Sequence, residues 1–277
     1  MITFGAPFAA MRKDPRWAKK VLLGGLINLI PYFGTFVVMG WALEYLRRVA
    51  WGLDQELPEW TGLGRHALRG LYGFAAIMPY SLALSLILTP VMVIVIAAVV
   101  IFATVAVGAT AAAGSPPDPA AFVGSTVLAT LVISFGSAIL IMPFSYAITP
   151  LVYSAYARVA LYDRLEAGFQ FREIWDSVKK SRPTLLRAWG YTVLVGLLVQ
   201  PLVLLSMAPY VGLLLLPAVA EGMPPQNVAL AAAALLVAIP LTLLLVGLAG
   251  VFVSIATHHW WGVHARAAYG LADAPAA

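Results

Sequence analysis

The segment YARVALY, at residues 156–162, ends a long apolar run, and two similar segments end other apolar runs. These are LRRVAWG at residues 46–52 and HARAAYG at residues 264–270. In each, an arginine precedes a small apolar pair and an aromatic residue. Arginine and aromatic side chains both favour the lipid–water interface. We interpret the segments as helix ends at one membrane surface, anchored by Arg48, Arg158 and Arg266. Chance is the alternative, since many membrane helices end in such residues.

The composition excludes an ordinary soluble protein. Of the 277 residues, 62% are hydrophobic and 10% are charged, whereas about 25% are charged in a typical soluble domain. No Lys or Arg occurs between Gly70 and Ala157 or between Ala188 and Ala265. One helical crossing of a bilayer needs about 20 apolar residues, so each stretch is several times longer than one crossing. The sequence predicts an all-α, polytopic helical integral membrane protein.

The positive charges are concentrated in a few segments. Of the 17 Lys and Arg, five lie in Arg12–Lys20, four in Arg47–Arg69, seven in Arg158–Arg187 and one at Arg266. The connections at 113–122 and 221–228 have none; each contains a diproline and one acid, Asp118 or Glu221. Basic residues in short loops stay on the cytoplasmic side during insertion. We therefore expect a multi-pass protein of the cell membrane with both termini in the cytoplasm and the diproline loops outside.

The order of basic, apolar and diproline segments occurs twice, which predicts two internal parallel repeats about an axis along the membrane normal. The expected domains are 1–46, an N-terminal interfacial helix with the first membrane segment; 47–160, the first repeat; 158–270, the second repeat; and 271–277, a disordered tail.

Asp14 followed by Pro15 suits a helix N-cap with Pro at the first helical position.

Prolines interrupt the predicted membrane segments. Residues 21–46 are basic at both ends and contain Pro31 and Gly34 at their centre, a pair that favours a break. This segment is a re-entrant hairpin if both ends lie inside, and a single crossing otherwise. Four longer limbs, each of more than 30 residues, exceed the length of a straight crossing. Division is expected at Pro79, Pro90, Pro143, Pro150, Pro201, Pro209 and Pro240. The number of crossings stays open, from four to eight.

Between the predicted repeats, residues 171–182 have the pattern of an amphipathic helix. Phe171, Ile174, Trp175 and Val178 share one face, and Arg172, Glu173, Asp176 and Lys179 lie on the other. This pattern is typical of a helix in the plane of the lipid headgroups.

A set of residues in the N-terminal part forms a familiar pattern. It consists of Asp14-Pro15, Trp17, Lys20, Gly24-Gly25-Leu26, Leu29-Ile30-Pro31, Gly40-Trp41, Leu57-Pro58-Glu59-Trp60 and Gly70. Together these residues resemble domain-of-unknown-function family 4013, polytopic membrane proteins of bacteria and archaea. The likeness is strongest over about the first 75 residues, and the LPEW tetrapeptide is its most specific part. No activity is established for that family, so the resemblance implies no catalytic residue.

Two glutamates occupy matching places in the predicted repeats. Glu59 precedes Trp60, and Glu173 lies two residues before Trp175. We expect each glutamate to cap the following helix or to bind basic residues of the loops, and we take these four residues as a candidate interfacial or structural pair. Glu44 precedes Arg47 and Arg48 by three and four residues, which predicts a local ion pair.

Polar residues within the apolar runs are few. Asn28 and Gln200 form a candidate intramembrane polar site; each could bond a carbonyl freed by a nearby proline or line a substrate path. His258, His259 and His264 are one, five and six residues apart, whereas helical zinc sites favour two His four apart. The chain has no cysteine and none of the common catalytic motifs. The sequence therefore predicts no metal site, no cofactor and no enzyme activity.

Two functions fit these observations. The favoured one is a non-catalytic membrane scaffold or accessory subunit, with the lipid bilayer and other membrane subunits or a second copy as partners. The alternative is a transporter or channel for a lipid-like or small apolar molecule, which the repeats and the two amides favour. Scarce intramembrane charge disfavours ion-coupled transport. Nucleic acid is not expected as a partner, because no basic stripe interleaves with stacking aromatic residues.

Overall fold

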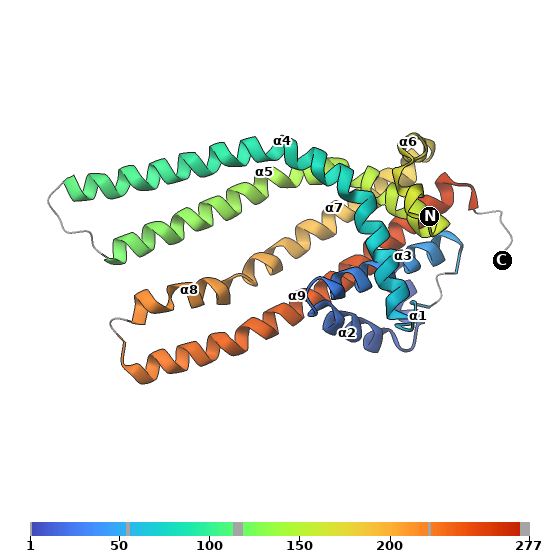
Figure 1. The fold of residues 1–277 in the computed structure, drawn as a ribbon. Coiled ribbons are helices and arrows are strands. Elements are labelled where there is room, and N and C mark those ends of the chain that lie inside the picture. Colours follow the sequence, from blue (N-terminus) through green and yellow to red (C-terminus); the bar gives the residue numbers. More distant parts are fainter. Residues whose placement is uncertain (1, 54–55, 113–118, 221–222, 272–277) are drawn as a thin grey trace. The chain divides into compact units, whose positions relative to one another are not determined.

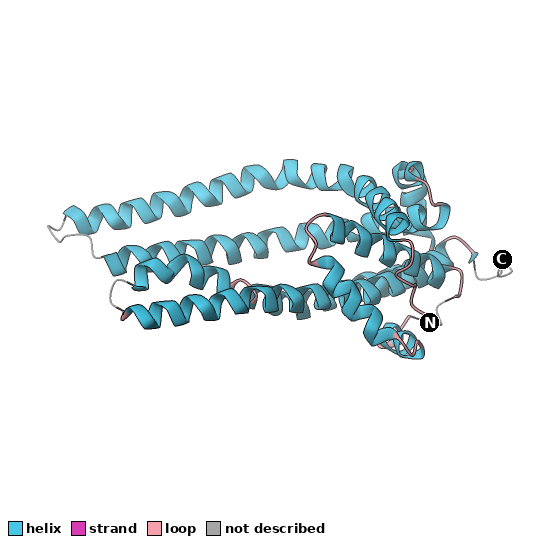
Figure 2. Ribbon diagram, turned by 60° about the horizontal axis from the view of Figure 1, so that its bottom comes forward, coloured by secondary structure: helices cyan, strands magenta, loops and turns pink. Residues whose placement is uncertain are grey.

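The computed structural model describes residues 2–53, 56–112, 119–220 and 223–271, and this part contains helices and no strand (Figures 1 and 2). The helices are α1 (Ala6–Lys13), α2 (Trp17–Asn28), α3 (Phe33–Ala50), α4 (Leu63–Ala112), α5 (Pro119–Tyr162), the short 3₁₀ helix η1 (Leu165–Phe169), α6 (Phe171–Lys180), α7 (Arg182–Leu205), α8 (Ala208–Ala220) and α9 (Pro225–Ala268). The all-α prediction is confirmed. The predicted tail, apart from Leu271, and the acids Asp118 and Glu221 lie outside the described residues.

Three stretches of helix are long and apolar enough to cross a membrane: Leu63–Ala98, Arg182–Leu213 and Pro225–Ala268. One crossing needs about 20 residues, and each of these stretches is longer than that. This finding applies to the described residues and rests on length and composition. It supports the prediction of a membrane protein, without fixing the number of passes.

The chain forms two compact units. Unit 1 contains Met1–Tyr80, Ile148–Ser206 and Pro240–Ala277, and unit 2 contains Ser81–Ala147 and Met207–Ile239. All 17 Lys and Arg belong to unit 1, and the sequence of unit 2 has none. In unit 2, large apolar side chains such as Leu86 and Leu230 are 76% and 72% exposed. The boundary between the units therefore separates a part that contains every Lys and Arg from a part that contains none.

The core of unit 1 is built around α3 and the C-terminal part of α9. Trp41 and Leu46 of α3 and Trp260 and Trp261 of α9 have no exposed surface. A buried indole normally finds an acceptor for its N–H. Trp260 donates to the carbonyl of Thr3 (3.1 Å) and Trp261 donates to the hydroxyl of Thr192 (3.0 Å). These bonds attach the N-terminus and α7 to α9 by specific contacts in addition to apolar packing.

The chain turns between α2 and α3, at the position where Pro31 and Gly34 predicted a break. Tyr32 has a positive φ of 59° and is 85% exposed. A Cβ at Gly34 would overlap the carbonyl oxygen of Ile27. The two helices therefore approach each other closely at the turn, because glycine leaves room for the backbone of α2.

The other prolines behave differently from the prediction. α4 continues through Pro79 and Pro90, and α5 continues through Pro143 and Pro150. Pro201 and Pro240 also lie inside helices. Proline removes one backbone hydrogen bond, which often bends a helix without ending it. Of the predicted divisions, one accompanies an interruption: α7 ends at Leu205 and α8 begins at Ala208, next to Pro209.

The start of α2 also differs from the prediction. Asp14 follows the last residue of an additional helix, α1, and α2 begins at Trp17 rather than at Pro15. The carboxylate of Asp14 still accepts a backbone hydrogen bond, from the N–H of Arg16 (2.8 Å). Its remaining bonds come from the side chain of Lys20, six residues on, and from the backbone of Leu57, which a local capping rule does not anticipate.

The ends of the three similar segments meet within unit 1. A Cβ at Gly52, after α3, would lie 2.9 Å from a guanidinium nitrogen of Arg266 on α9. The guanidinium of Arg158 on α5 lies over the ring of Tyr269, 5.9 Å from its centre. The C-terminal ends of α3, α5 and α9 are thus close neighbours.

Helices α3 and α4 cross with their backbones in contact. A Cβ at Gly40 would overlap the carbonyl oxygen of His66, and one at Gly70 would overlap that of Phe36. Backbone atoms cannot move aside as the end of a flexible side chain can. Both glycines are therefore required by this crossing.

We predict that Gly40→Ala destabilises the protein by about 1–3 kcal/mol, the usual cost of overpacking. Gly190→Ala is the matched control, because a Cβ there meets nothing within 4 Å; it should be neutral or stabilising by up to about 1 kcal/mol. Thermal unfolding of both variants in detergent, followed by size-exclusion chromatography, measures the difference. Equal stability of Gly40→Ala and the wild type would contradict the close crossing.

Candidate functional site

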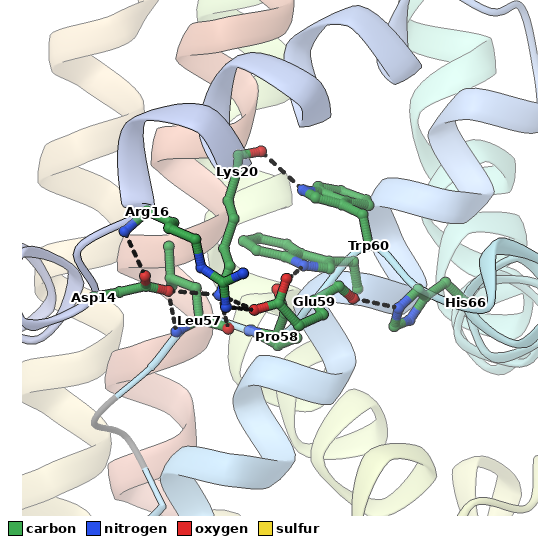
Figure 3. A network of polar contacts seen from close by, with 9 residues as sticks. Asp14, Arg16, Lys20, Leu57, Pro58, Glu59, Trp60 and His66 are labelled. Carbon is green, nitrogen blue, oxygen red and sulfur yellow. Dashed lines mark hydrogen bonds and ion pairs between the residues drawn. The ribbon is translucent and has the colours of Figure 1, made fainter.

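The most extensive polar network in the described part of unit 1 is centred on Lys20 of α2 (Figure 3). Its ammonium group donates to Asp14 Oδ2 (2.6 Å) and to the carbonyl of Leu57 (2.7 Å), and it lies 2.9 Å from Glu59 Oε1. The side chain of Lys20 is 4% exposed. An ammonium group has three N–H donors, so these three oxygens match its full capacity and neutralise its charge.

Asp14 completes the network on the acidic side. In addition to Lys20, its carboxylate accepts the backbone N–H groups of Arg16 (2.8 Å) and Leu57 (3.1 Å). Burial alone would raise the pKa of Asp14, but the hydrogen bonds from Lys20 and from these backbone groups outweigh it, so the pKa is lowered. Asp14 therefore stays ionised and joins the start of α2 to the loop that contains Leu57–Trp60, called the LPEW loop below.

The two tryptophans of the network lie parallel to each other. Trp41 of α3 and Trp60 of the LPEW loop stack with ring centres 4.7 Å apart and an interplanar angle of 7°. Trp41 donates to the carbonyl of Pro58 (2.9 Å), and Trp60 donates to the carbonyl of Lys20 (2.8 Å). A Cβ at Gly24 would lie 2.8 Å from the Trp60 ring. This glycine therefore makes room for the indole against α2.

Glu59 connects the network to a neighbouring polar pocket. Its carboxylate binds Arg16 (2.5 Å) in addition to Lys20, and its carbonyl lies 3.1 Å from His66 Nε2 on α4. The pocket has a volume of about 410 Å³. Its lining consists of Glu44, Arg47, Arg48, Pro58, Glu59, Thr61, Arg65, His66, Arg69 and Asp163.

Arg69 is the buried cation of this pocket, with a side chain 4% exposed. It donates to both oxygens of Asp163, each at 2.9 Å, and also to Glu44. Paired N–H···O bonds of this kind are among the strongest polar contacts in proteins. The hydrogen bonds from Arg69 lower the pKa of Asp163. The residue after α5 is thereby fixed to the first turns of α4.

Arg158 forms a comparable buried site near α6. Its side chain is 7% exposed; Nε donates to the carbonyl of Ala167 (3.1 Å), and Nη2 donates to Gln170. Nη1 lies 3.8 Å from Glu173 Oε2, which is an ion pair too long for a hydrogen bond. Its guanidinium also lies over the ring of Tyr162, 5.1 Å from the ring centre.

The predicted glutamates both contact cations, through different geometries. Glu59 binds Lys20 and Arg16, and Glu173 lies beside Arg158. Glu173 does not cap α6, since that helix has Gln170 at its N-cap without a side-chain cap bond. Trp60 is packed in the network, whereas Trp175 is 50% exposed. The two pairs thus share a charge contact but differ in burial.

The other predicted residues are dispersed. Asn28 is half-buried, and a Cβ at Gly250 of α9 would lie 4.0 Å from its amide nitrogen. Gln200 is half-buried on α7. Neither amide belongs to the lining of the pocket around Arg69. Arg48 forms the predicted ion pair with Glu44 at 3.3 Å.

The histidines of α9 are buried among aromatic rings. His259 lies 3.1 Å from the hydroxyl of Tyr45 and His264 lies 3.0 Å from that of Thr184, while His258 is next to the rings of Tyr153 and Tyr156. Within the residues that the structure describes, no group of three or more His, Cys, Asp or Glu could hold a metal ion. The histidines therefore extend the packing between α9 and its neighbours.

Residues 23–208, about two thirds of the chain, match the family described as "Protein of unknown function (DUF4013)". The chain belongs to this family. The resemblance carried by the LPEW loop is thereby confirmed. No protein of curated function and no solved structure matches the chain. The DUF4013 match contains Trp41, Trp60 and Gly70, and it begins after Asp14 and Lys20.

Several polar contacts of this site were not predicted from the sequence. Arg69 and Asp163 are 94 residues apart, and Lys20 and Leu57 are 37 apart. The local pattern marked Asp14 as a helix cap, and only the resemblance to the family drew attention to Lys20. Their separation of six residues is not a spacing for a helical ion pair.

We predict that Lys20→Met destabilises the protein by about 3–5 kcal/mol, because it leaves the buried carboxylate of Asp14 without its counter-ion. Lys19→Met is the matched control, since Lys19 is exposed one position earlier; its stability should stay within about 0.5 kcal/mol of wild type. Thermal unfolding in the same detergent compares them. If the two variants melted at one temperature, the network would not be a source of stability.

Proposed function

We propose that the chain is a multi-pass protein of the cell membrane that acts as a non-catalytic scaffold or accessory subunit. The observation that supports it is the distribution of charge. Unit 1 contains every Lys and Arg, whereas unit 2 has none and exposes large apolar side chains. Charged groups are expensive in hydrocarbon, so unit 2 suits lipid and the basic segments of unit 1 suit the cytoplasmic surface.

The scaffold proposal also draws on the way unit 1 is held together. The buried cations Lys20 and Arg69 are neutralised by acids of the same chain. Such closed networks fix the relative positions of α2, the LPEW loop and α4. A rigid surface of this kind suits a protein that positions other membrane subunits or a second copy of itself.

α6 provides an interfacial element for this surface. Ile174 and Ser177 are buried, while Phe171 and Trp175 are 53% and 50% exposed. Lys179 lies over the ring of Trp175, 5.2 Å from its centre. Exposed aromatic rings beside cations are typical of the headgroup region. We place α6 there, with the α2–α3 hairpin entering the same leaflet through its exposed apolar turn.

The alternative is a transporter or channel for a lipid-like or small apolar molecule. It draws on the two parallel repeats predicted from the sequence and on the half-buried amides Asn28 and Gln200. A transport path requires these amides to be reached by water. A scaffold requires no such path, and this difference separates the two functions.

We predict the orientation of single cysteines introduced into the cysteine-free chain. Membrane-impermeant maleimide added outside intact cells should label Asp118→Cys and Glu221→Cys. Thr61→Cys, next to the LPEW loop, should be labelled only after permeabilisation. Outside labelling of Thr61→Cys would overturn the placement of the basic segments. For the scaffold, Asn28→Cys and Gln200→Cys should resist the reagent from both sides; labelling of both would favour transport.

A further inference from the structure

A second set of contacts, around Arg158, has the features of an anion site. Two pockets, of about 500 and 630 Å³, both contain Arg158 and Gln170 in their lining. The first also contains Arg164 and Glu166, and the second contains Arg172 and Glu173. Three arginines and two glutamates therefore surround this region, which lies wholly within unit 1.

The buried guanidinium of Arg158 has no acid within hydrogen-bond distance. Two of its nitrogens donate to the neutral acceptors Ala167 and Gln170, and the group also contacts the side chain of Tyr269. Its nearest acid is Glu173, at 3.8 Å, with a side chain that is 56% exposed. A buried charge usually requires closer compensation than this. The site therefore has room for a stronger anionic acceptor.

The start of α6 adds donors at the same place. Gln170 is the N-cap residue, and no side chain caps this ten-residue helix. The first backbone N–H groups of a helix are free donors and attract anions. Residues 170–173 belong to the lining of the larger pocket. Backbone donors and the buried guanidinium thus border one cavity.

The remaining two arginines can complete an anion site. Arg164 and Arg172 are exposed, and neither makes an ion pair or a side-chain hydrogen bond with a described residue. Guanidinium groups bind phosphate oxygens through paired N–H donors. Apolar rings lie beside them: Tyr162 is 52% exposed and Phe171 is 53% exposed. This combination fits the phosphate of a lipid whose chains continue into the bilayer.

We propose that Arg158, Arg164, Arg172 and the N-terminus of α6 bind the phosphate of an anionic phospholipid headgroup. Glu173 competes for Arg158 and is displaced when lipid binds. The inference rests on the membrane proposal above, because only a chain at the bilayer surface meets such a lipid continuously. The pocket around Arg69 is a weaker candidate, because its buried cation already binds two acids.

Native mass spectrometry of the full chain in detergent tests the site. The probes are phosphatidylglycerol, phosphatidylcholine and inorganic phosphate, and the readout is the apparent Kd of each. Phosphatidylglycerol should bind about tenfold more tightly than phosphatidylcholine. Arg164→Gln and Arg172→Gln should each weaken its binding about tenfold, the effect of losing one charge-assisted contact. Arg187→Gln is the control, since it removes one exposed positive charge outside both pockets.

Glu173→Gln separates a lipid-binding role of Arg158 from a purely structural one, because a structural role would not change the affinity for phosphatidylglycerol. Removing the competing carboxylate should tighten phosphatidylglycerol binding several-fold. Equal binding by Arg164→Gln, Arg172→Gln and Arg187→Gln would overturn the site. Full competition by millimolar inorganic phosphate would overturn the lipid as ligand and indicate free phosphate. Either result leaves the cysteine-labelling test of membrane orientation unaffected, so the two proposals fail separately.

Discussion

The constraint on which this structure depends is the cost of placing charge in hydrocarbon, about 2.5–3.5 kcal/mol for one basic or acidic residue at the centre of a spanning helix. Helices satisfy their own backbone groups there, so apolar helices are the natural solution for unit 2. The chain meets the constraint by confining its 17 Lys and Arg to unit 1. The buried cations Lys20 and Arg69 of unit 1 are surrounded by protein oxygens. The membrane proposal and the organisation of the polar networks therefore follow from one physical requirement.

The networks solve the problem of buried charge in different ways. Lys20 is a point charge that contacts three oxygens, while Arg69 uses its planar group to bind both oxygens of Asp163. Arg158 is the exception, since its nearest acid is distant. This contrast within one unit supports a structural role for the first two and a ligand role for the third. Lys20 and Arg69 each connect segments that are far apart in the sequence, so polar contacts of buried cations also determine how helix ends are joined.

The sequence predicted those features that depend on local pattern. Apolar length predicted helices, Pro31 with Gly34 predicted a turn, and the spacing of Glu44 and Arg48 predicted an ion pair. The sequence did not predict contacts between residues that are distant in the chain. The bond between Arg69 and Asp163 cannot be derived from periodicity, and neither can the contact of Lys20 with Leu57. The predicted breaks at the prolines of α4 and α5 were wrong for another reason. A proline removes one backbone hydrogen bond, but the remaining hydrogen bonds of a long helix keep the helix continuous.

The most direct test of the central claim is the environment of unit 2 in a bilayer. Spin labels on cysteines at Leu86, Ile94, Leu230 and Leu236, all exposed apolar positions of unit 2, can be measured by electron paramagnetic resonance in proteoliposomes. The account predicts relaxation by dissolved oxygen and little relaxation by a water-soluble nickel complex, whereas a label at the basic position Arg187 should show the reverse. Strong relaxation by nickel at the unit 2 positions would place that unit in water and contradict the account.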